Sequence, residues 1–396
     1  MASHILVLGG DGYLGWPTAM YFSQRGFAVT VADNYMRRHA CDEIDVGMLY
    51  PVPTLQERAK IWYEHTGKEI KVVIGDLTNP EVMRSLFNGT VSYDWAINPT
   101  FTGIPETVVH YAEQPSAPYS QMDYKRADVT ITNNLRVTNN LVFAVRDYAC
   151  DTHIIKLGTM GEYGTPNIDI EEGWLEVEHK GRKGKFLFPR QAGSLYHTTK
   201  VMDTDLLWFA VRIWELKVTD LMQGPVYGNQ TEESAIDERL NTIFNYDEVF
   251  GTVVNRFVVQ AIAGYPLTVY GQGGQTRGYL NIQDTLQCVH RSTDTPAQKG
   301  ELRIFNQIME TFSVSELAEL TQTVGNKLGH EVEIKRIENP RKEAEEHYYN
   351  PTYQGLIGIG VEPHYLTEDV MAQMLRVADR YKDNIRNDVI FRGVRW

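Results

Sequence analysis

The hydrophobic pattern of this chain predicts strands that alternate with helices. Residues 4–8 form a short apolar run, residues 16–25 have the spacing of an amphipathic helix, and residues 27–32 form a second apolar run. The later predicted strands cover 70–74, 107–111, 153–157 and 217–222, and the two longest predicted helices cover 123–148 and 194–215. Because strands that alternate with helices build a parallel sheet covered on both faces, we expect a doubly wound α/β fold.

Two inserts, 36–69 and 168–190, interrupt this alternation. The first contains Thr54-Leu-Gln-Glu57, a capping box that opens a helix, and the second has the pattern of a β-hairpin. In the second half of the chain the alternation weakens. The two expected units are residues 1–225, which form the main sheet domain, and residues 226–396, a smaller lobe from which some segments return to the sheet.

The composition narrows the possible partners and compartments. The 51 acidic residues outnumber the 38 basic ones and give a net charge of −13, so nucleic acid and anionic membrane surfaces are poor partners. No apolar run is long enough to span a membrane, and no signal peptide is evident. Cys41, Cys150 and Cys288 lie far apart, which predicts neither a metal site nor a disulfide framework and favours a cytoplasmic setting.

A glycine-rich turn follows the first strand. Gly9-x-x-Gly12-x-x-Gly15 ends that strand and opens the first helix, which is typical of a Rossmann dinucleotide site with the pyrophosphate on the helix N-terminus. Asp33 follows the second strand, where a carboxylate binds a ribose 2′-hydroxyl and repels a 2′-phosphate. This favours NAD over NADP, although Arg37 and Arg38 could meet a phosphate. The remaining expected cofactor contacts are Tyr13, Leu14, Asn34, Arg37, Asp76, which should reach the adenine edge, and Leu77.

The sequence Tyr196-His197-Thr198-Thr199-Lys200 predicts the site of chemistry. Its spacing places the tyrosine and the lysine on one face of a helix, close to the cofactor. The ammonium of Lys200 is expected to lower the pKa of Tyr196, so that its hydroxyl can carry a proton while a substrate hydroxyl loses hydride. Thr159, at the end of the fifth strand, can hydrogen-bond the reacting hydroxyl. A purely structural Tyr196 is the alternative.

Together these motifs resemble the extended short-chain dehydrogenases that modify nucleotide sugars. Residues 9–16, 156–173, 270–279 and 339–350 are similar to the UDP-sulfoquinovose synthase family, and the resemblance covers nearly the whole chain. It implies that UDP-glucose, NAD and sulfite give UDP-sulfoquinovose. The implied steps are oxidation at carbon 4, elimination of water across carbons 5 and 6, addition of sulfite at carbon 6, and re-reduction. It also implies a homodimer formed through two long helices of each subunit.

The resemblance also implies roles for individual residues. Thr159, Tyr196 and Lys200 would handle the proton transfer that accompanies hydride transfer. The related 4,6-dehydratases have an Asp-Glu pair after the threonine, where this chain has Met160 and Gly161, so the elimination needs another acid and base. His197 and Glu113 are the candidates, although His197 can equally be a packing residue because helical neighbours point about 100° apart. The expected substrate contacts are Gln114, Met160, Gln223, Asn255, Gln275, and Arg277 and Arg341, which would hold the UDP pyrophosphate.

Two positions depart from the family pattern. The family has an arginine where this chain has Pro115, and a histidine where this chain has Met202. An arginine at position 115 would be a natural partner for sulfite. Three functions therefore stay open: the full synthase; a 5,6-dehydratase or epimerase that acts on a related nucleotide sugar or nucleoside without adding sulfite; and a non-catalytic protein that holds NAD and a sugar nucleotide. The presence of Thr159, Tyr196 and Lys200 argues against the non-catalytic protein.

Overall fold

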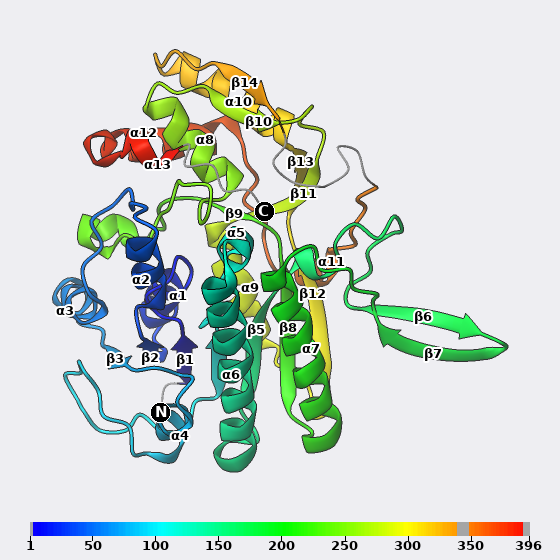
Figure 1. Cartoon of the computed structure of the whole chain (residues 1–396). Helices are drawn as coiled ribbons and strands as arrows, with labels where there is room; N and C mark the ends of the chain where they lie inside the picture. The colour runs from blue at the N-terminus through cyan, green and yellow to red at the C-terminus, as the bar shows by residue number, and fades with distance from the viewer. Residues whose placement is uncertain (1–2, 339–347, 391–396) are drawn as a thin grey trace.

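The apolar runs of the sequence pair side by side in the computed structural model, which describes residues 3–338 and 348–390. Within that part of the chain, seven parallel strands form one sheet in the order β12-β8-β5-β4-β1-β2-β3 (Figure 1). The strands are β1 (His4–Leu8), β2 (Ala28–Asp33), β3 (Ile70–Ile74), β4 (Thr107–His110), β5 (His153–Thr159), β8 (Lys217–Gln223) and β12 (Leu302–Gln307). The first six confirm the predicted strands. The seventh comes from the second half of the chain.

Helices cover both faces of this sheet, so the predicted doubly wound fold is confirmed. On one face Val137, Leu141 and Leu207 pack against the strands, and on the other Trp16 and Trp62 do so. The helices of the first face are α4 (Pro80–Asn88), α6 (Tyr124–Tyr148) and α7 (Leu195–Trp214), and those of the second are α1 (Gly15–Gln24), α3 (Leu55–Thr66) and α9 (Ile282–Asp294).

The helix starts follow local sequence signals. The Thr54 side chain accepts a hydrogen bond from the backbone N–H of Glu57, while the Glu57 carboxylate accepts one from the N–H of Thr54, so the predicted capping box is confirmed. Asp123 caps α6 in the same position, and Ser194 caps α7 by accepting from the N–H of His197. The cap at Ser194 sets where the helix that carries Tyr196 begins.

The smaller lobe lies beyond the carboxyl ends of the strands (Figure 1). Its helices are α8 (Val253–Ile262), α10 (Val314–Lys327) and α12 (Glu368–Asp379), and its strands are β9 (Val226–Tyr227), β10 (Leu267–Tyr270), β11 (Thr276–Asn281), β13 (Glu310–Ser313) and β14 (Ile334–Ile337). They share a core with α2 (Met36–Glu43) from the first insert. The remaining short helices are α5 (Ala117–Gln121), α11 (Gln354–Gly358) and α13 (Asn387–Ile390), and the 3₁₀ turns are η1 (Met160–Glu162), η2 (Ser234–Ile236), η3 (Glu238–Leu240) and η4 (Lys382–Asn384).

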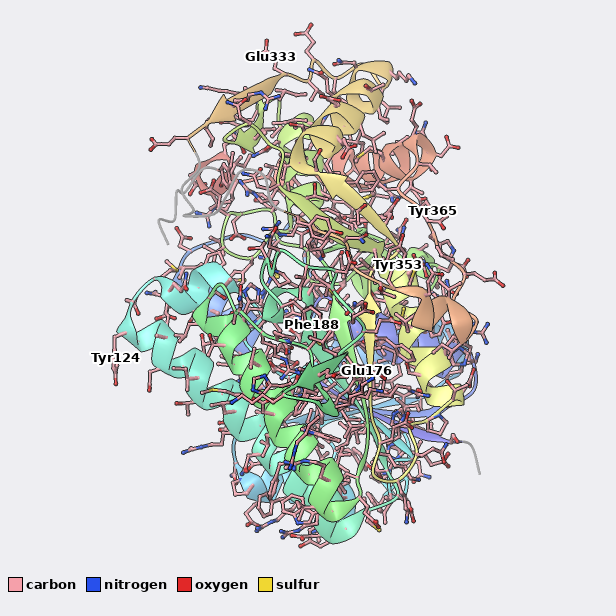
Figure 2. All side chains as sticks on the ribbon, turned by 90° about the vertical axis from the view of Figure 1, so that its right-hand side faces the viewer. Tyr124, Glu176, Phe188, Glu333, Tyr353 and Tyr365 are labelled. Atoms are coloured by element: carbon pink, nitrogen blue, oxygen red, sulfur yellow. The ribbon has the colours of Figure 1, made fainter. Side chains whose placement is uncertain are left out.

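The second insert forms the predicted hairpin, β6 (Trp174–His179) and β7 (Arg182–Leu187), which projects from the side of the molecule (Figure 1). Its base packs on α7, where the rings of Trp174 and Trp208 lie 5.0 Å apart. In Figure 2 Glu176 of the hairpin faces the viewer, and Tyr124 of α6 lies at the edge of the molecule. No helix among the described residues is both long enough and apolar enough to cross a membrane.

Candidate functional site

A cavity of about 1270 Å³ lies between the carboxyl ends of the strands and the smaller lobe. The glycine-rich turn, the ends of β2, β4 and β5, and the first turn of α7 line it from the sheet domain, and α8, β10 and β11 line it from the lobe. Ligands of doubly wound folds bind at this edge of the sheet, because the strand order reverses there and leaves a crevice. The cavity is large enough for a dinucleotide together with a second ligand.

The three glycines of the Gly9-x-x-Gly12-x-x-Gly15 motif are each required for a structural reason, and the reasons differ. Gly9 has a φ of +85°, and a Cβ on Gly15 would lie 2.0 Å from the carbonyl oxygen of Gly9, so both are required by the backbone itself. A Cβ on Gly12 would meet only the Gly9 oxygen, at 3.5 Å, and Gly12 lines the cavity. The missing side chain of Gly12 therefore opens space in the cavity, whereas those of Gly9 and Gly15 are excluded by the backbone. A pyrophosphate at the start of α1 would fit this space.

Asp33 lies at the end of β2, as expected, and lines the cavity. Its carboxylate accepts hydrogen bonds from the backbone N–H of Asp11, at 2.9 Å, and of Tyr35, at 2.6 Å. Burial and the nearby charge of Asp11 raise the pKa of Asp33 to about 6. The other expected cofactor residues that line the cavity are Tyr13, Leu14, Asn34, Arg37 and Leu77. Asp76 does not line it, because its exposed side chain caps the local turn by accepting from Thr78.

A segment from the second half of the chain, residues 240–249, crosses over the glycine-rich turn. The hydroxyl of Thr242 donates to the carbonyl oxygen of Tyr13, and the indole N–H of Trp16 donates to that of Leu240. Arg37 donates to the side chain of Asn245 at 2.8 Å. Because nearly all of this segment is buried, it closes one side of the cofactor half of the cavity. No pattern in the sequence indicates this crossing.

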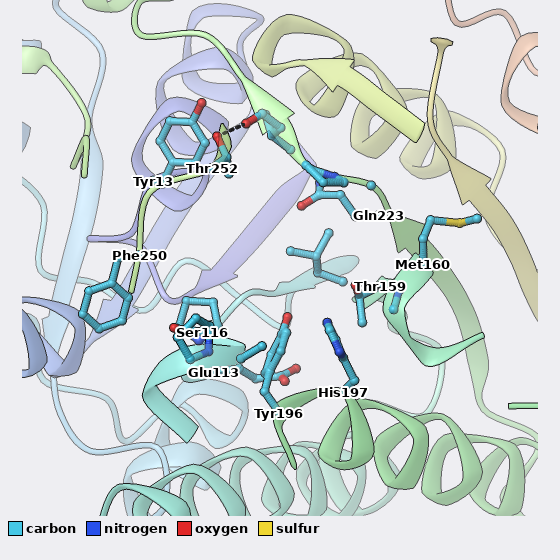
Figure 3. Close-up of a pocket in the computed structure, with 18 of the residues that line it drawn as sticks. Tyr13, Glu113, Ser116, Thr159, Met160, Tyr196, His197, Gln223, Phe250 and Thr252 are labelled. Carbon is cyan, nitrogen blue, oxygen red and sulfur yellow. Dashed lines mark hydrogen bonds between the residues drawn. The ribbon is translucent and has the colours of Figure 1, made fainter. Parts of the chain in front are cut away.

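Thr159, Tyr196 and His197 all face the cavity (Figure 3). Thr159 ends β5 and caps η1, and its hydroxyl accepts from the N–H of Gly161. The rings of Tyr196 and His197 lie 5.1 Å apart, so these helical neighbours share one site. A Cβ on Gly161 would lie only 2.4 Å from the imidazole Nε2 of His197. The imidazole therefore fills the space in which a side chain at position 161 would stand.

Lys200, an expected cofactor contact, pairs with Glu113 and does not line the cavity. Its ammonium lies 2.7 Å from the Glu113 carboxylate and donates to the carbonyl oxygen of Leu157 at 2.5 Å, and both charged side chains are buried. Burial, and then the negative charge of Glu113, raise the pKa of Tyr196 well above its usual value. This rise in pKa is opposite to the lowering expected from the Tyr-x-x-x-Lys spacing. The reason is the Glu113 carboxylate, which pairs with the lysine and which the sequence did not reveal.

Glu113 is correspondingly a bound carboxylate. Burial alone would raise its pKa, but the charge of Lys200 reverses this and lowers it. The imidazole of His110 lies 3.7 Å from the other carboxylate oxygen, and burial lowers the pKa of that imidazole to about 4. Glu113 lines the cavity but is already engaged, whereas His197 faces the cavity directly.

A buried charged cluster, formed by Lys156, Glu162, Thr204 and Asp220, lies behind this site. The ammonium of Lys156 is 3.2 Å from Glu162 and 3.5 Å from Asp220, and it donates to the Thr204 hydroxyl and to the backbone oxygen of Lys200. Glu162 in turn accepts from the backbone N–H of Thr159. The cluster therefore ties the turn that carries Thr159 to the helix that carries Lys200.

The expected substrate residues divide into two groups. Met160, Gln223, Gln275 and Arg277 line the cavity. Gln114 and Asn255 do not: the Gln114 amide bonds to Ser116 and Thr130, and Asn255 donates to the hydroxyl of Tyr13 and accepts from Gly228. Arg341 lies outside the described residues.

Sequence reasoning missed Arg256, the residue after Asn255. It lines the cavity from α8, is 7% exposed, and lies 3.2 Å from Glu248. Its signal in the sequence is an arginine placed between apolar residues, Val254 and Phe257, on a helix that is otherwise buried. A buried arginine at a cavity wall is suited to anionic oxygens, because its planar fork can donate two parallel hydrogen bonds.

Comparison with known proteins places this arrangement in a family context. The sequence model of the NAD dependent epimerase/dehydratase family matches residues 5–306. The chain is 45% identical over 392 residues to the chloroplastic UDP-sulfoquinovose synthase of Spinacia oleracea, covering 99% of this chain and 79% of the relative. It is 43% identical over 396 residues to the UDP-sulfoquinovose synthase of Sulfolobus acidocaldarius, covering 99% and 97%.

Solved structures agree on the fold. The UDP-glucose 4-epimerase of Thermotoga maritima, crystallised with UDP-glucose, superimposes with a TM-score of 0.67 at 19% identity, covering 96% of this chain and 99% of that one. At this level of identity the likeness concerns the fold alone.

Proposed function

This chain belongs to the NAD dependent epimerase/dehydratase family and is an NAD-dependent enzyme, and from that premise we propose that it converts UDP-glucose and sulfite into UDP-sulfoquinovose. One observation carries the proposal: Thr159, Tyr196 and His197 face one cavity, while positions 160 and 161 lack the Asp-Glu pair with which the 4,6-dehydratases eliminate water across carbons 5 and 6. The full-length likeness to two UDP-sulfoquinovose synthases supports it. Residues 1–225 would hold the cofactor, and residues 226–396 most of the sugar nucleotide.

The side chains at the cavity suit the proton transfers of this reaction. Bound NAD supplies the oxidant for carbon 4 and the hydride for the final reduction. Tyr196 accepts the proton of the carbon 4 hydroxyl, which Thr159 orients by a hydrogen bond, and returns it at the end. The ketone at carbon 4 acidifies the proton on carbon 5, which His197 removes and passes to the departing carbon 6 hydroxyl, so that water leaves. Sulfite then adds at carbon 6 as carbon 5 regains a proton.

Pyrophosphate binding falls to arginines at the lobe side of the cavity. Arg277 and Arg256 line it there, and we include Arg341 on the strength of the family resemblance. Guanidinium groups match phosphate oxygens in geometry and charge. An acidic chain can therefore still bind a doubly charged ligand, because these local charges act at short range while the remote carboxylates are screened.

Mass spectrometry of the products formed from UDP-glucose with and without sulfite tests the proposal. We expect UDP-sulfoquinovose only when sulfite is present. Pro115, which lines the cavity where the family has an arginine, favours the second candidate, a 5,6-dehydratase or epimerase that adds no sulfite. A product whose mass is independent of sulfite would establish that alternative and refute the synthase.

The packing of His197 against Gly161 predicts the effect of adding one methyl group. In Gly161→Ala the new Cβ would displace the imidazole, so we expect the elimination to fall at least tenfold, while reduction of the cofactor by UDP-glucose persists. The measurement pairs absorbance of the reduced nicotinamide with product analysis. Gly358→Ala on α11 is the matched control, because a Cβ there has no atom within 4 Å and Gly358 does not line the cavity. Equal turnover of both variants would remove His197 from the elimination.

Pro115 predicts weak capture of sulfite. Proline supplies neither a charge nor a backbone N–H, and the loss of one charge-assisted hydrogen bond costs about 1.5–3 kcal/mol, or roughly 10- to 150-fold in binding. Pro115→Arg should therefore raise the yield of sulfonated product at low sulfite, measured as product against sulfite concentration. If the wild-type protein already saturates at low sulfite and the arginine changes nothing, another group at the cavity holds the anion.

We also propose a homodimer formed through α6 and α7. Large apolar side chains are exposed on these two helices, namely Ile131, Phe143, Phe209 and Ile213. Such a stripe on a pair of helices is typical of a helix–helix interface. Sedimentation velocity should give a dimer for the wild-type protein and a monomer for Phe209→Glu/Ile213→Glu. A monomer for both proteins would refute the proposed dimer.

The three free cysteines suit a reducing compartment such as the cytoplasm.

A further inference from the structure

Beside the cofactor half of the cavity lies a partly buried group of two carboxylates and two guanidiniums, formed by Asp11, Asp33, Arg38 and Arg58. Asp11 comes from the middle of the glycine-rich turn and is 1% exposed. Its backbone N–H donates to Asp33, while its side-chain oxygens accept from Arg38, at 2.7 Å each, and from Arg58, at 2.6 Å. The glycine-rich turn thus carries an anion that faces away from the cavity.

This anion immobilises Arg38. The guanidinium makes four hydrogen bonds, two to Asp11 and two to the carbonyl oxygens of Val52 and Pro53. Arg38 does not line the cavity. In dinucleotide sites an arginine just after the second strand accommodates the 2′-phosphate of NADP, while an acidic residue at the strand end binds the free 2′-hydroxyl of NAD. This chain has both the acidic residue, Asp33, and the arginine, Arg38, but Asp11 binds the arginine and keeps it from the cavity.

The neighbouring Arg37 is also engaged elsewhere. Its guanidinium donates to Asn245 and lies 3.8 Å above the ring of Phe250. Although Arg37 lines the cavity, its polar edge is turned toward the crossing segment. A 2′-phosphate would therefore meet Asp33, with its negative charge, while neither Arg37 nor Arg38 is turned to receive it.

We propose that Asp11 is a determinant of the preference for NAD over NADP, because it holds Arg38 away from the ribose while Asp33 repels the phosphate. Asp11 and Asp33 act at different points. Asp33 contacts the ribose, whereas Asp11 removes the countercharge that would make a phosphate acceptable. This inference rests on the NAD site of the family and does not depend on which sugar nucleotide or second substrate the cavity takes.

A competition experiment with the purified full-length protein tests the proposal. The protein is equilibrated with equal concentrations of NAD and NADP, separated from free nucleotide and denatured, and the bound nucleotides are quantified. Asp33→Ala alone should raise the ratio of NADP to NAD only modestly, because Arg38 stays clamped. Adding Asp11→Asn should raise it by about a further tenfold or more, the worth of one charge-assisted contact to phosphate. Adding Arg38→Met to that double variant should abolish the gain.

Two further variants keep the test decisive. Removing Asp11 leaves Arg58 buried without an anion, so Asp33→Ala/Asp11→Asn/Arg58→Met removes that cation together with its partner and should show the same gain. Asp33→Ala/Arg38→Met should match Asp33→Ala. The proposal is overturned if Asp11→Asn leaves the ratio of bound NADP to NAD unchanged, both in Asp33→Ala and in Asp33→Ala/Arg58→Met. It is also overturned if the gain survives Arg38→Met and disappears instead with Arg37→Met. Thermal melts of each variant confirm that the compared proteins are folded.

Discussion

Tyr196→Phe should reduce hydride transfer by about 10²–10⁴-fold, the usual contribution of a positioned general acid or base. The change removes one oxygen and leaves the ring, its packing against His197 and the start of α7 in place. Burial and the charge of Glu113 raise the pKa of this tyrosine, and phenylalanine has no hydroxyl that could carry a proton. The rate is measured as absorbance of the reduced nicotinamide after rapid mixing with UDP-glucose.

Binding of UDP to Tyr196→Phe, measured by calorimetry, should be unchanged, because Arg256 and Arg277, which suit its pyrophosphate, line the cavity from the lobe side. Tyr124→Phe is the matched control, since that side chain is 85% exposed on α6 and should leave both quantities alone. A loss of less than tenfold in hydride transfer would show that Tyr196 is a packing residue. The proton would then have to be carried by another group at the cavity.

Lys156→Met should lower the free energy of unfolding by about 3–5 kcal/mol, because it leaves the buried carboxylate of Asp220 without its cation and that of Glu162 with Arg190 alone, at 3.6 Å. Methionine has nearly the length of lysine, so the loss reports charge rather than volume. Denaturant unfolding at neutral pH measures it. Lys60→Met breaks an exposed pair with Glu64 and should change stability by no more than about 0.5 kcal/mol.

The pH dependence of this variant separates charge from packing. Burial and the charge of Asp220 already raise the pKa of Glu162, and removing the ammonium should raise it further. A group with a higher pKa in the folded state contributes stability below its unfolded pKa and loses it as the pH rises through the folded value. The deficit of Lys156→Met should therefore shrink when the pH is lowered from neutrality toward about 5. A deficit independent of pH would mean that shape, not charge, was lost.

Much of the fold was available from the chain as written. The apolar runs, with period and length suited to buried strands, identified β1 to β5 and β8 of the seven-stranded sheet. The capping box at Thr54 identified the start of α3. Both signals act between residues close in sequence. The seventh strand, β12, was not identified. Its position in the sheet depends on pairing with β8, which is distant in sequence.

The candidate site divides in the same way. The glycine-rich turn, Asp33, Thr159 and Tyr196 could be identified as candidates, because the element that carries each of them reaches the edge of the sheet where the cavity lies. The pairing of Lys200 with Glu113, and that of Arg38 with Asp11, could not, since each joins segments that the chain brings together only by folding.

By itself, then, the sequence determined the doubly wound sheet, the glycine-rich turn, and the residues at the end of β5 and the start of α7 that line the cavity. Only the tertiary structure decided which charges are available there: Lys200 is neutralised by Glu113, Arg38 is held by Asp11, and His197 takes the space left by Gly161. The physical reason is that element type and strand ends follow from local periodicity. Burial and charge pairing depend on which distant side chains meet, and these set the pKa of a side chain and its freedom to bind a ligand.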